Sequence, residues 1–230
     1  MKGQLLPDRQ VALDPRTAEY NGSWIRHSGD PLLVYGQDMI ALFFDRIKDL
    51  SAPVVLDIGA NTGSFCLLAA FHPLLRVYAF EPVAEVYGLL CANIAVNWLA
   101  DRVSSFPVAL SDYIGRGTMT VPYNLKQSGL SFLDDRAPSM PCRTEVVQVT
   151  TLDLFCAKHA ITHVDAIKID VEGHESEVLK GGIDLIARDH PLIMAEATDI
   201  DETIPLLEAW GYTVENHTTD LLATWNENKN

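Results

Sequence analysis

The sequence has few cysteines and few basic residues, and each shortage excludes a class of function. The four cysteines, Cys66, Cys91, Cys142 and Cys156, include no Cys-x-x-Cys pair, so we predict no structural zinc site. Lysine and arginine number 17 against 31 aspartate and glutamate residues, which gives a net charge of −14. Because nucleic-acid binders need a basic footprint to meet the phosphates, we expect no nucleic-acid partner.

The sequence also lacks long apolar runs. No segment approaches the roughly 20 apolar residues that cross a bilayer. The start of the chain has no apolar core of the kind that a signal peptide carries. We therefore predict a cytoplasmic protein without a membrane span. Its 230 residues, 48% of them hydrophobic, are enough for one domain with a substantial core.

Short apolar runs alternate with segments of helical spacing over most of the chain. Five runs have strand character, at 54–58, 76–80, 103–110, 164–170 and 191–195. Two more, at 212–216 and 221–225, form a closing antiparallel pair. This alternation predicts an α/β fold with a doubly wound, mostly parallel seven-stranded sheet of the Rossmann-like type.

Two regions depart from this alternation. Residues 1–50 are predicted to form an N-terminal arm and a cap helix that pack on the domain, and residues 51–230 a single domain. Within that domain, residues 117–149 form an inserted loop whose ends, 117–121 and 144–149, have strand character. Because long loops in compact domains tend to be lids or binding loops, we expect this insertion to lie near a ligand.

The most informative stretch runs from Val54 to Phe65. An apolar strand carries Asp57 near its end, and Gly59 and Gly63 follow in a short turn. The glycines permit a tight turn and let a ligand approach the bare backbone where the next helix begins. Ligands of open α/β sheets bind at the carboxyl ends of the strands. The stretch therefore predicts a site for a nucleoside-containing cofactor.

A second carboxylate stands at the end of the next strand. Glu81 lies roughly 20 residues beyond the glycine turn, a spacing at which an acidic residue accepts hydrogen bonds from a ribose diol. Pro82 follows it directly and cannot extend the strand, so Glu81 is predicted at the strand tip.

The glycine turn itself separates the cofactor classes. Dinucleotide sites favour Gly-x-Gly-x-x-Gly, whereas the residue at the middle glycine position here is Asn61. No Lys-Ser/Thr pair follows to make a phosphate loop, and Asp57 would repel a phosphate. An ammonium group suits that carboxylate better, which favours S-adenosylmethionine over NAD. The alternatives left open are a nucleotide-dependent oxidoreductase and a non-catalytic domain that binds the cofactor.

Four motifs in order resemble a known family. Leu-Asp-Ile-Gly-Ala-Asn-Thr-Gly at 56–63, Phe-Glu-Pro at 80–82 and Ala-Leu-Ser-Asp at 109–112 resemble a Class I S-adenosylmethionine-dependent methyltransferase. Ile-Lys-Ile-Asp-Val-Glu-Gly-His-Glu at 167–175, followed by Val-Leu-Lys-Gly at 178–181, resembles the FkbM family specifically. The resemblance extends from Val54 to Glu196.

The resemblance implies a role for each matching position. The turn would hold the methionine part of the cofactor and Glu81 its ribose. Ser111 and Asp112 would lie beside the adenine, Val83 would supply an apolar wall, and the methyl group would point toward Asp170. The complete predicted cofactor-binding set is Asp57, Gly59, Ala60, Asn61, Gly63, Phe65, Glu81, Pro82, Val83, Ser111, Asp112 and Asp170. The family generally methylates oxygen, often a hydroxyl of a sugar, a glycan or a secondary metabolite.

Three residues after the fourth parallel strand are the candidate catalytic residues. Asp170, Glu172 and His174 are expected to cluster there, and a histidine ordinarily titrates close to neutral pH, which suits a proton acceptor. His174 has a second interpretation, as a residue at a helix start that holds the loop by hydrogen bonds. Carboxylates with a histidine can bind a divalent ion, but Glu-x-His is not a known ligand pattern, so we predict no metal. The expected partner is an acceptor with a hydroxyl group, and a homodimer remains open.

Overall fold

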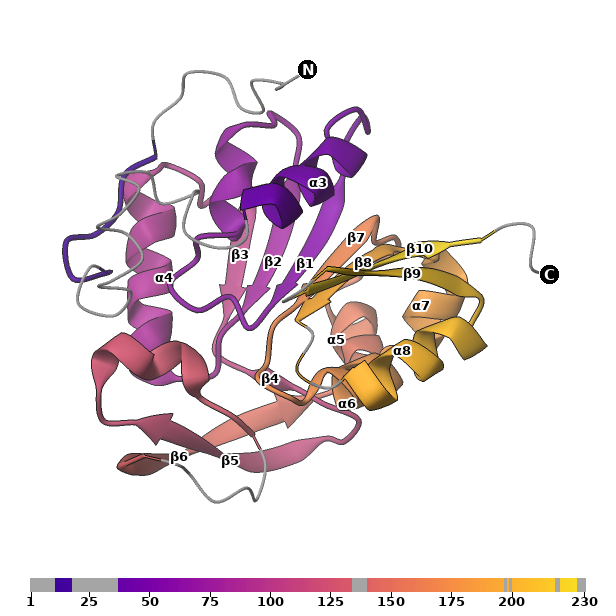
Figure 1. The fold of residues 1–230 in the computed structure, drawn as a ribbon. Helices are drawn as coiled ribbons and strands as arrows, with labels where there is room; N and C mark the ends of the chain where they lie inside the picture. The colour runs from indigo at the N-terminus through magenta and orange to yellow at the C-terminus, as the bar shows by residue number, and fades with distance from the viewer. Residues whose placement is uncertain are drawn as a thin grey trace.

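Two β-sheets with helices around them form the part of the chain that the computed structural model describes (Figure 1). The described residues are 11–17, 37–133, 140–196, 198, 200–217 and 220–226. The predicted N-terminal arm therefore lies largely outside them, and the predicted division into an arm and one domain stays a prediction. Within these ranges, no helix combines the length and the apolar character that crossing a membrane requires.

The main sheet has seven strands in the order β3-β2-β1-β7-β8-β10-β9. Strands β3, β2, β1, β7 and β8 are parallel, and β10 runs antiparallel to both of its neighbours. This confirms the predicted doubly wound sheet with its antiparallel C-terminal pair. The strands are β1 (Val54–Ile58), β2 (Arg76–Phe80), β3 (Val103–Phe106), β7 (Ala166–Ile169), β8 (Leu192–Glu196), β9 (Tyr212–His217) and β10 (Asp220–Trp225).

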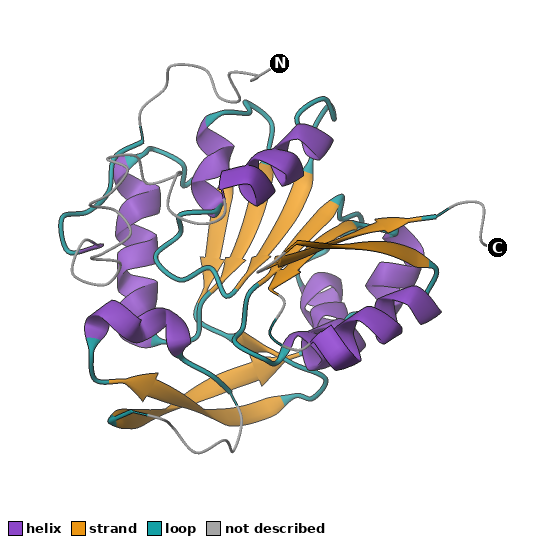
Figure 2. Cartoon of the chain, viewed as in Figure 1, coloured by secondary structure: helices purple, strands orange, loops and turns teal. Residues whose placement is uncertain are grey.

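Helices cover both faces of this sheet, as Figure 2 shows. Side chains of a strand alternate between the faces, so Val55 joins one buried apolar cluster and Leu56 the other. The first cluster includes side chains of α3, η2 and α4, and the second includes side chains of α5, α6, α7 and α8. The helices are α3 (Gln37–Ile47), the 3-10 helix η2 (Cys66–Ala70), α4 (Ala84–Val96), α5 (Leu152–Lys158), α6 (Glu175–Lys180), α7 (Ile183–Asp189) and α8 (Ile200–Ala209).

A second, three-stranded sheet replaces the end of one predicted strand and most of the predicted loop. The single strand predicted over 103–110 is wrong, because β3 ends at Phe106 and Pro107 has no backbone N–H for the ladder. The chain then enters the second sheet, whose order is β4-β6-β5. Its elements are β4 (Ala109–Leu110), β5 (Gly115–Pro122), the 3-10 helix η3 (Leu125–Leu130) and β6 (Cys142–Thr150).

Two adjacent glycines divide the helical region after β7. Helix α6 ends at Lys180 and α7 begins at Ile183, with Gly181 and Gly182 between them. A Cβ atom on Gly181 would overlap the backbone carbonyl oxygen of Ser111, which directly follows β4. The missing side chain therefore lets the helix pair approach the second sheet at backbone distance.

Replacing Gly181 by alanine should test this close approach. Gly181→Ala is expected to lower the free energy of unfolding by about 1–3 kcal/mol, because a rigid backbone atom must move to admit the methyl group. Gly88→Ala is the matched control, since a Cβ at that exposed position in α4 meets no described atom within 4 Å. The control should raise stability by roughly 0.5–1 kcal/mol through helix propensity. Urea unfolding measures both, and an unchanged Gly181→Ala would contradict the proposed contact.

Candidate functional site

A cavity opens where the parallel strands of the main sheet end. Gly59 follows β1, Glu81 follows β2, Asp170 follows β7 and Glu196 ends β8, and all four line the cavity. Its volume is about 740 Å³, counted with the solvent-filled space at its mouth. This is the edge of an open α/β sheet at which ligands bind.

The predicted site residues divide into two groups around this cavity. Seven of them line it, namely Gly59, Asn61, Glu81, Pro82, Asp170, Glu172 and His174. The other seven do not line it, namely Asp57, Ala60, Gly63, Phe65, Val83, Ser111 and Asp112. Six of this second group are buried, all except the exposed Asp112. A contact between any of these residues and the cofactor stays a prediction.

The cavity turn, which we define as residues 59–63, has an unusual backbone. Gly59, Asn61 and Gly63 have φ angles of 73°, 51° and 92°, in the left-handed region that glycine and asparagine tolerate best. A Cβ atom on Gly59 would overlap the backbone carbonyl oxygen of Asp170. The glycine therefore lets the turn after β1 pack directly against the end of β7.

Glu81 holds the cavity turn and keeps capacity for a ligand. Its Oε2 accepts from the Asn61 backbone N–H at 3.0 Å, and its Oε1 accepts from the Val83 N–H at 2.8 Å. Each carboxylate oxygen can accept a second hydrogen bond. Burial raises the pKa of Glu81 to about 7, although both of these hydrogen bonds act in the opposite direction. A diol facing Glu81 would find two acceptor oxygens in one plane.

Lys168 joins the ends of β1 and β7 behind the cavity. Its Nζ donates to the Gly59 carbonyl at 2.9 Å and lies 3.2 Å from Asp170 Oδ2 and 3.4 Å from Asp57 Oδ1. Asp57 is fully buried, which raises the pKa of its carboxyl, and the lysine ammonium opposes that rise. The carboxylate predicted to meet an ammonium group of the cofactor thus has the ammonium group of Lys168 beside it.

Three carboxylates form an acidic corner at the ends of β7 and β8. Asp170, Glu172 and Glu196 each place an oxygen within 4.8 Å of the others. Burial raises the pKa of Glu196 to about 9, and the charges of Asp170 and Glu172 add to the rise. Glu196, which ends β8, is not among the predicted site residues, because sequence does not show which strand-end carboxylates converge.

The acidic corner could accept a divalent cation, since hard cations favour carboxylate oxygens. His174 is not part of this group, so the predicted cluster of carboxylates with a histidine forms only in part. The absence of a functional metal remains a prediction. Activity that chelation abolishes and Mg²⁺ restores would overturn it.

A buried glutamate shapes the loop that carries Glu172 and His174. Glu175 Oε1 accepts from the backbone N–H groups of Val171 and Gly173, both at 3.2 Å, and Thr198 Oγ1 donates to Glu175 Oε2 at 3.0 Å. Glu172 has a φ of 58° and is followed by Gly173 at 90°, so this loop also uses the left-handed region. Sequence reasoning missed Glu175 as a loop support, and its place at the first position of α6 was the available signal.

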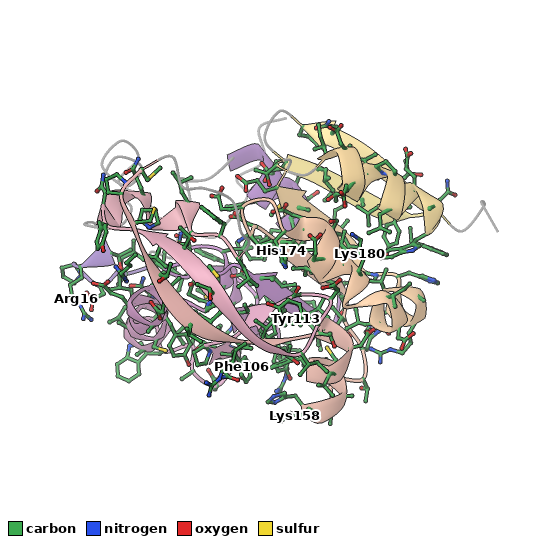
Figure 3. All side chains as sticks on the ribbon, turned by 90° about the horizontal axis from the view of Figure 1, so that it is seen from below. Arg16, Phe106, Tyr113, Lys158, His174 and Lys180 are labelled. Atoms are coloured by element: carbon green, nitrogen blue, oxygen red, sulfur yellow. The ribbon has the colours of Figure 1, made fainter. Side chains whose placement is uncertain are left out.

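His174 connects this loop to the second sheet. Its Nε2 lies 2.9 Å from Ser111 Oγ, and that hydroxyl donates to Asp112 Oδ1 at 3.2 Å. The other ring nitrogen, Nδ1, lies 3.7 Å from Glu177 Oε2, so the imidazole has a hydroxyl on one side and a carboxylate on the other. Figure 3 shows His174 between the second sheet and the C-terminal helices. The contact supports the interpretation of His174 as a residue that holds the loop, and it leaves the catalytic role as a prediction.

The second sheet supplies an apolar wall that sequence reasoning did not identify. Leu110 of β4, Met119 of β5 and Leu133 beyond η3 line the cavity, with Val108 from the connection between β3 and β4. The alternation of apolar residues at 119 and 121, both buried, was the signal for an inward face. This wall suits a flat, weakly polar group such as a nucleobase.

Comparisons with known proteins agree with this geometry. Residues 57–214 match the model of a family described as the methyltransferase FkbM domain. The 31-O-demethyl-FK506 methyltransferase FkbM of Streptomyces tacrolimicus is 28% identical, over 84% of this chain and 87% of its own length. The 2-O-methyltransferase NoeI of Sinorhizobium fredii is 27% identical, over 59% of this chain and 60% of its own length. In fold, the precorrin-6y C5,15-methyltransferase of Geobacter metallireducens has a TM-score of 0.50 at 16% identity, covering 84% of this chain and 90% of its own.

Glu196→Gln should remove a pH dependence of stability. The pKa of Glu196 is raised from 4.5 to about 9, so the native state keeps a proton that the unfolded chain releases. Stability tied to that proton is fully present below the unfolded pKa and is lost as the pH rises toward about 9. Urea unfolding at several pH values should therefore show a smaller decline for Glu196→Gln than for the parent. The exposed Glu208→Gln serves as control, and equal declines in parent and Glu196→Gln would contradict the raised pKa.

Proposed function

The chain belongs to the FkbM methyltransferase domain family, and we propose that it methylates a hydroxyl oxygen of a small molecule or glycan with S-adenosylmethionine as donor. The observation that carries the proposal is the pairing of Glu81 with the cavity turn. Glu81 is held by the N–H groups of Asn61 and Val83, and it lines the cavity beside that turn. A carboxylate in this position matches a ribose diol.

The residues that line the cavity fit S-adenosylmethionine in charge. The donor carries a sulfonium and an ammonium group, and the carboxylates of Asp170 and Glu172 lie nearby in the acidic corner. Glu81 would hold the ribose, and the wall that includes Leu110 and Met119 would cover the adenine. When bound, S-adenosylmethionine supplies an electrophilic methyl group. A dinucleotide would instead bring a pyrophosphate close to these carboxylates, which disfavours the oxidoreductase alternative.

Oxygen as the methylated atom is supported by the names of two relatives. One is a 31-O-demethyl-FK506 methyltransferase and the other a 2-O-methyltransferase, so both names refer to methyl transfer to oxygen. A hydroxyl acceptor gains a methyl group and gives up its proton. Alignment of the acceptor supplies much of the rate in such a transfer, and a nearby base supplies part of the rest.

Asp170, Glu172 and His174 are our proposed groups for orienting the acceptor and receiving its proton. All three line the cavity, and Asp170 and Glu172 lie close to Glu196 in the acidic corner. Because the pKa of Glu196 is raised to about 9, its carboxyl keeps a proton near neutral pH and can donate a hydrogen bond to an acceptor oxygen. The remaining alternative, a non-catalytic cofactor-binding domain, would give binding of S-adenosylhomocysteine without transfer of a labelled methyl group to any hydroxylated acceptor.

Glu81→Gln should weaken the binding of S-adenosylhomocysteine by about tenfold or more. The amide keeps the size of the side chain but removes its charge and one acceptor oxygen, and a charge-assisted hydrogen bond contributes roughly 1.5–3 kcal/mol. Isothermal titration calorimetry measures the dissociation constant, and Glu208→Gln on the exposed side of α8 is the matched control. No binding by the parent would sink the cofactor assignment, and equal affinity in Glu81→Gln would remove Glu81 from the ribose site.

His174→Asn should change the pH–rate profile of methyl transfer if His174 receives the proton. The parent is then expected to lose activity on the acidic side with an apparent pKa near that of histidine, roughly 6.5. The pH–rate profile of His174→Asn should lack this loss of activity on the acidic side, and its turnover should be at least about 100-fold slower. Ser111→Ala is the control, because it removes the contact with Nε2 but keeps the imidazole. If His174→Asn and the parent share one profile, His174 holds the loop and is not the base.

A further inference from the structure

A hydrogen-bond network behind the cavity centres on Asn93 of α4. This side chain is fully buried, although asparagine is a weak helix former. Its Nδ2 donates to the Thr62 carbonyl at 2.7 Å and to Thr17 Oγ1 at 3.0 Å. Its Oδ1 accepts from the backbone N–H of Asp14 at 2.7 Å. One side chain therefore contacts both the cavity turn and the N-terminal segment, which we define as residues 11–17.

The N-terminal segment is anchored on α4 by a second asparagine. Asn97, one helical turn after Asn93, accepts from the Ala12 N–H at 2.9 Å and donates to the Ala12 carbonyl at 2.7 Å. Within the segment, Arg16 forms a two-point ion pair with the Asp14 carboxylate at 2.8 and 2.9 Å. Figure 3 shows Arg16 at the outer edge of the molecule. The segment therefore lies on α4 with its ion pair outward and Thr17 buried.

The cavity turn needs support from outside itself. Three of its five positions are in the left-handed region of φ. This conformation costs Asn61 free energy that it does not cost a glycine. Glu81 supports the turn from the cavity side through the Asn61 N–H. Asn93, which does not line the cavity, supports the turn through the carbonyl of the buried Thr62. The two supports act on neighbouring residues of the turn, Asn61 and Thr62.

We infer that Asn93 is a positioning residue through which the N-terminal segment stabilises the cavity turn in its cofactor-binding form. Both N–H donors and the carbonyl oxygen of the amide are used, so a loosened segment leaves part of a buried amide group without its partners. The side-chain amide of Asn93 can regain hydrogen-bond partners only by rotating away from the Thr62 carbonyl. Docking of the segment and the shape of the turn are thereby coupled. The effect on the cofactor rests on the proposed function, whereas the coupling itself does not.

Hydrogen–deuterium exchange of the full chain tests the coupling without any ligand. Asn93→Asp keeps the size of the side chain but removes both donors, and the amides of residues 59–63 should exchange about tenfold faster. Thr17→Val removes the hydrogen bond between Asn93 and the Thr17 hydroxyl and leaves the contact of Asn93 with Thr62 in place. It should accelerate the same amides about threefold. This second variant also keeps the test open if the buried carboxyl group that Asn93→Asp introduces prevents folding.

A graded variant and an unrelated control separate this coupling from general loosening. Asn97→Asp removes the donor to the Ala12 carbonyl and weakens the anchor of the N-terminal segment, so it should accelerate the amides of residues 59–63 about threefold, as Thr17→Val does. Thr203→Val removes a buried hydroxyl of α8 whose oxygen has no hydrogen-bond partner among the described residues, and it should leave that exchange within about twofold of the parent. The inference is wrong if Asn93→Asp and Thr17→Val also leave the exchange there, or if Thr203→Val accelerates the turn as much as Asn93→Asp.

Calorimetry with S-adenosylhomocysteine then tests the link to the cofactor. Asn93→Asp should weaken binding by about the same factor as it accelerates exchange in the turn, whereas Thr203→Val should bind as the parent does. Faster exchange with unchanged affinity would show that Asn93 supports the turn but does not position it for the cofactor, which overturns the inference. If the parent does not bind at all, the proposed function fails, and the exchange comparison still decides the coupling.

Discussion

The contact between Lys168 and the backbone of Gly59 is the interaction on which the rest of the site depends. Two parallel strands end here with carboxylates, Asp57 and Asp170, on either side of one buried ammonium group. Without that positive charge, two carboxyl groups would share a poorly solvated space, and the pKa of Asp57 would rise further because the ammonium group opposes that rise. Its hydrogen bond to Gly59 also fixes where the cavity turn begins. One lysine thus lets an acidic edge form on a tightly packed sheet.

The two sheets contribute different chemistry to the cavity. Among the described residues, every charged side chain that lines it comes from a strand end of the main sheet or from the loop that follows, as Glu81, Asp170 and Glu196 illustrate. The second sheet contributes apolar side chains, including Met119. The main sheet is rigid because both of its faces are packed, so it holds the charged groups in place. The second sheet places its apolar side chains opposite these charged groups, which suits a flat, weakly polar group such as a nucleobase.

Local sequence patterns predicted the main sheet well. The features that these patterns missed depend on contacts between residues far apart in the sequence. Asp57, Glu81 and Asp170 were predicted at strand ends because apolar runs stop there. The structure has the strands β1, β2 and β7 at these positions. Pro107 was visible, yet nothing nearby showed that the chain would leave the main sheet after it, because the partner of β4 is β6, far along the chain. The bonds of Asn93 to Thr62 and Thr17 span 31 and 76 positions. Sequence periodicity carries no information about pairs so far apart.

The contrast between the two sides of the cavity has a consequence for recognition. A ligand with one polar edge and one apolar face binds favourably in a single orientation. In the reversed orientation, the carboxylates of the main sheet would contact its apolar face. That orientation would also turn the polar edge toward Leu110 and Leu133. The contrast between the two sheets therefore orients such a ligand before any reacting atom is in reach. Its orientation is set where the two sheets meet, and not by any single side chain.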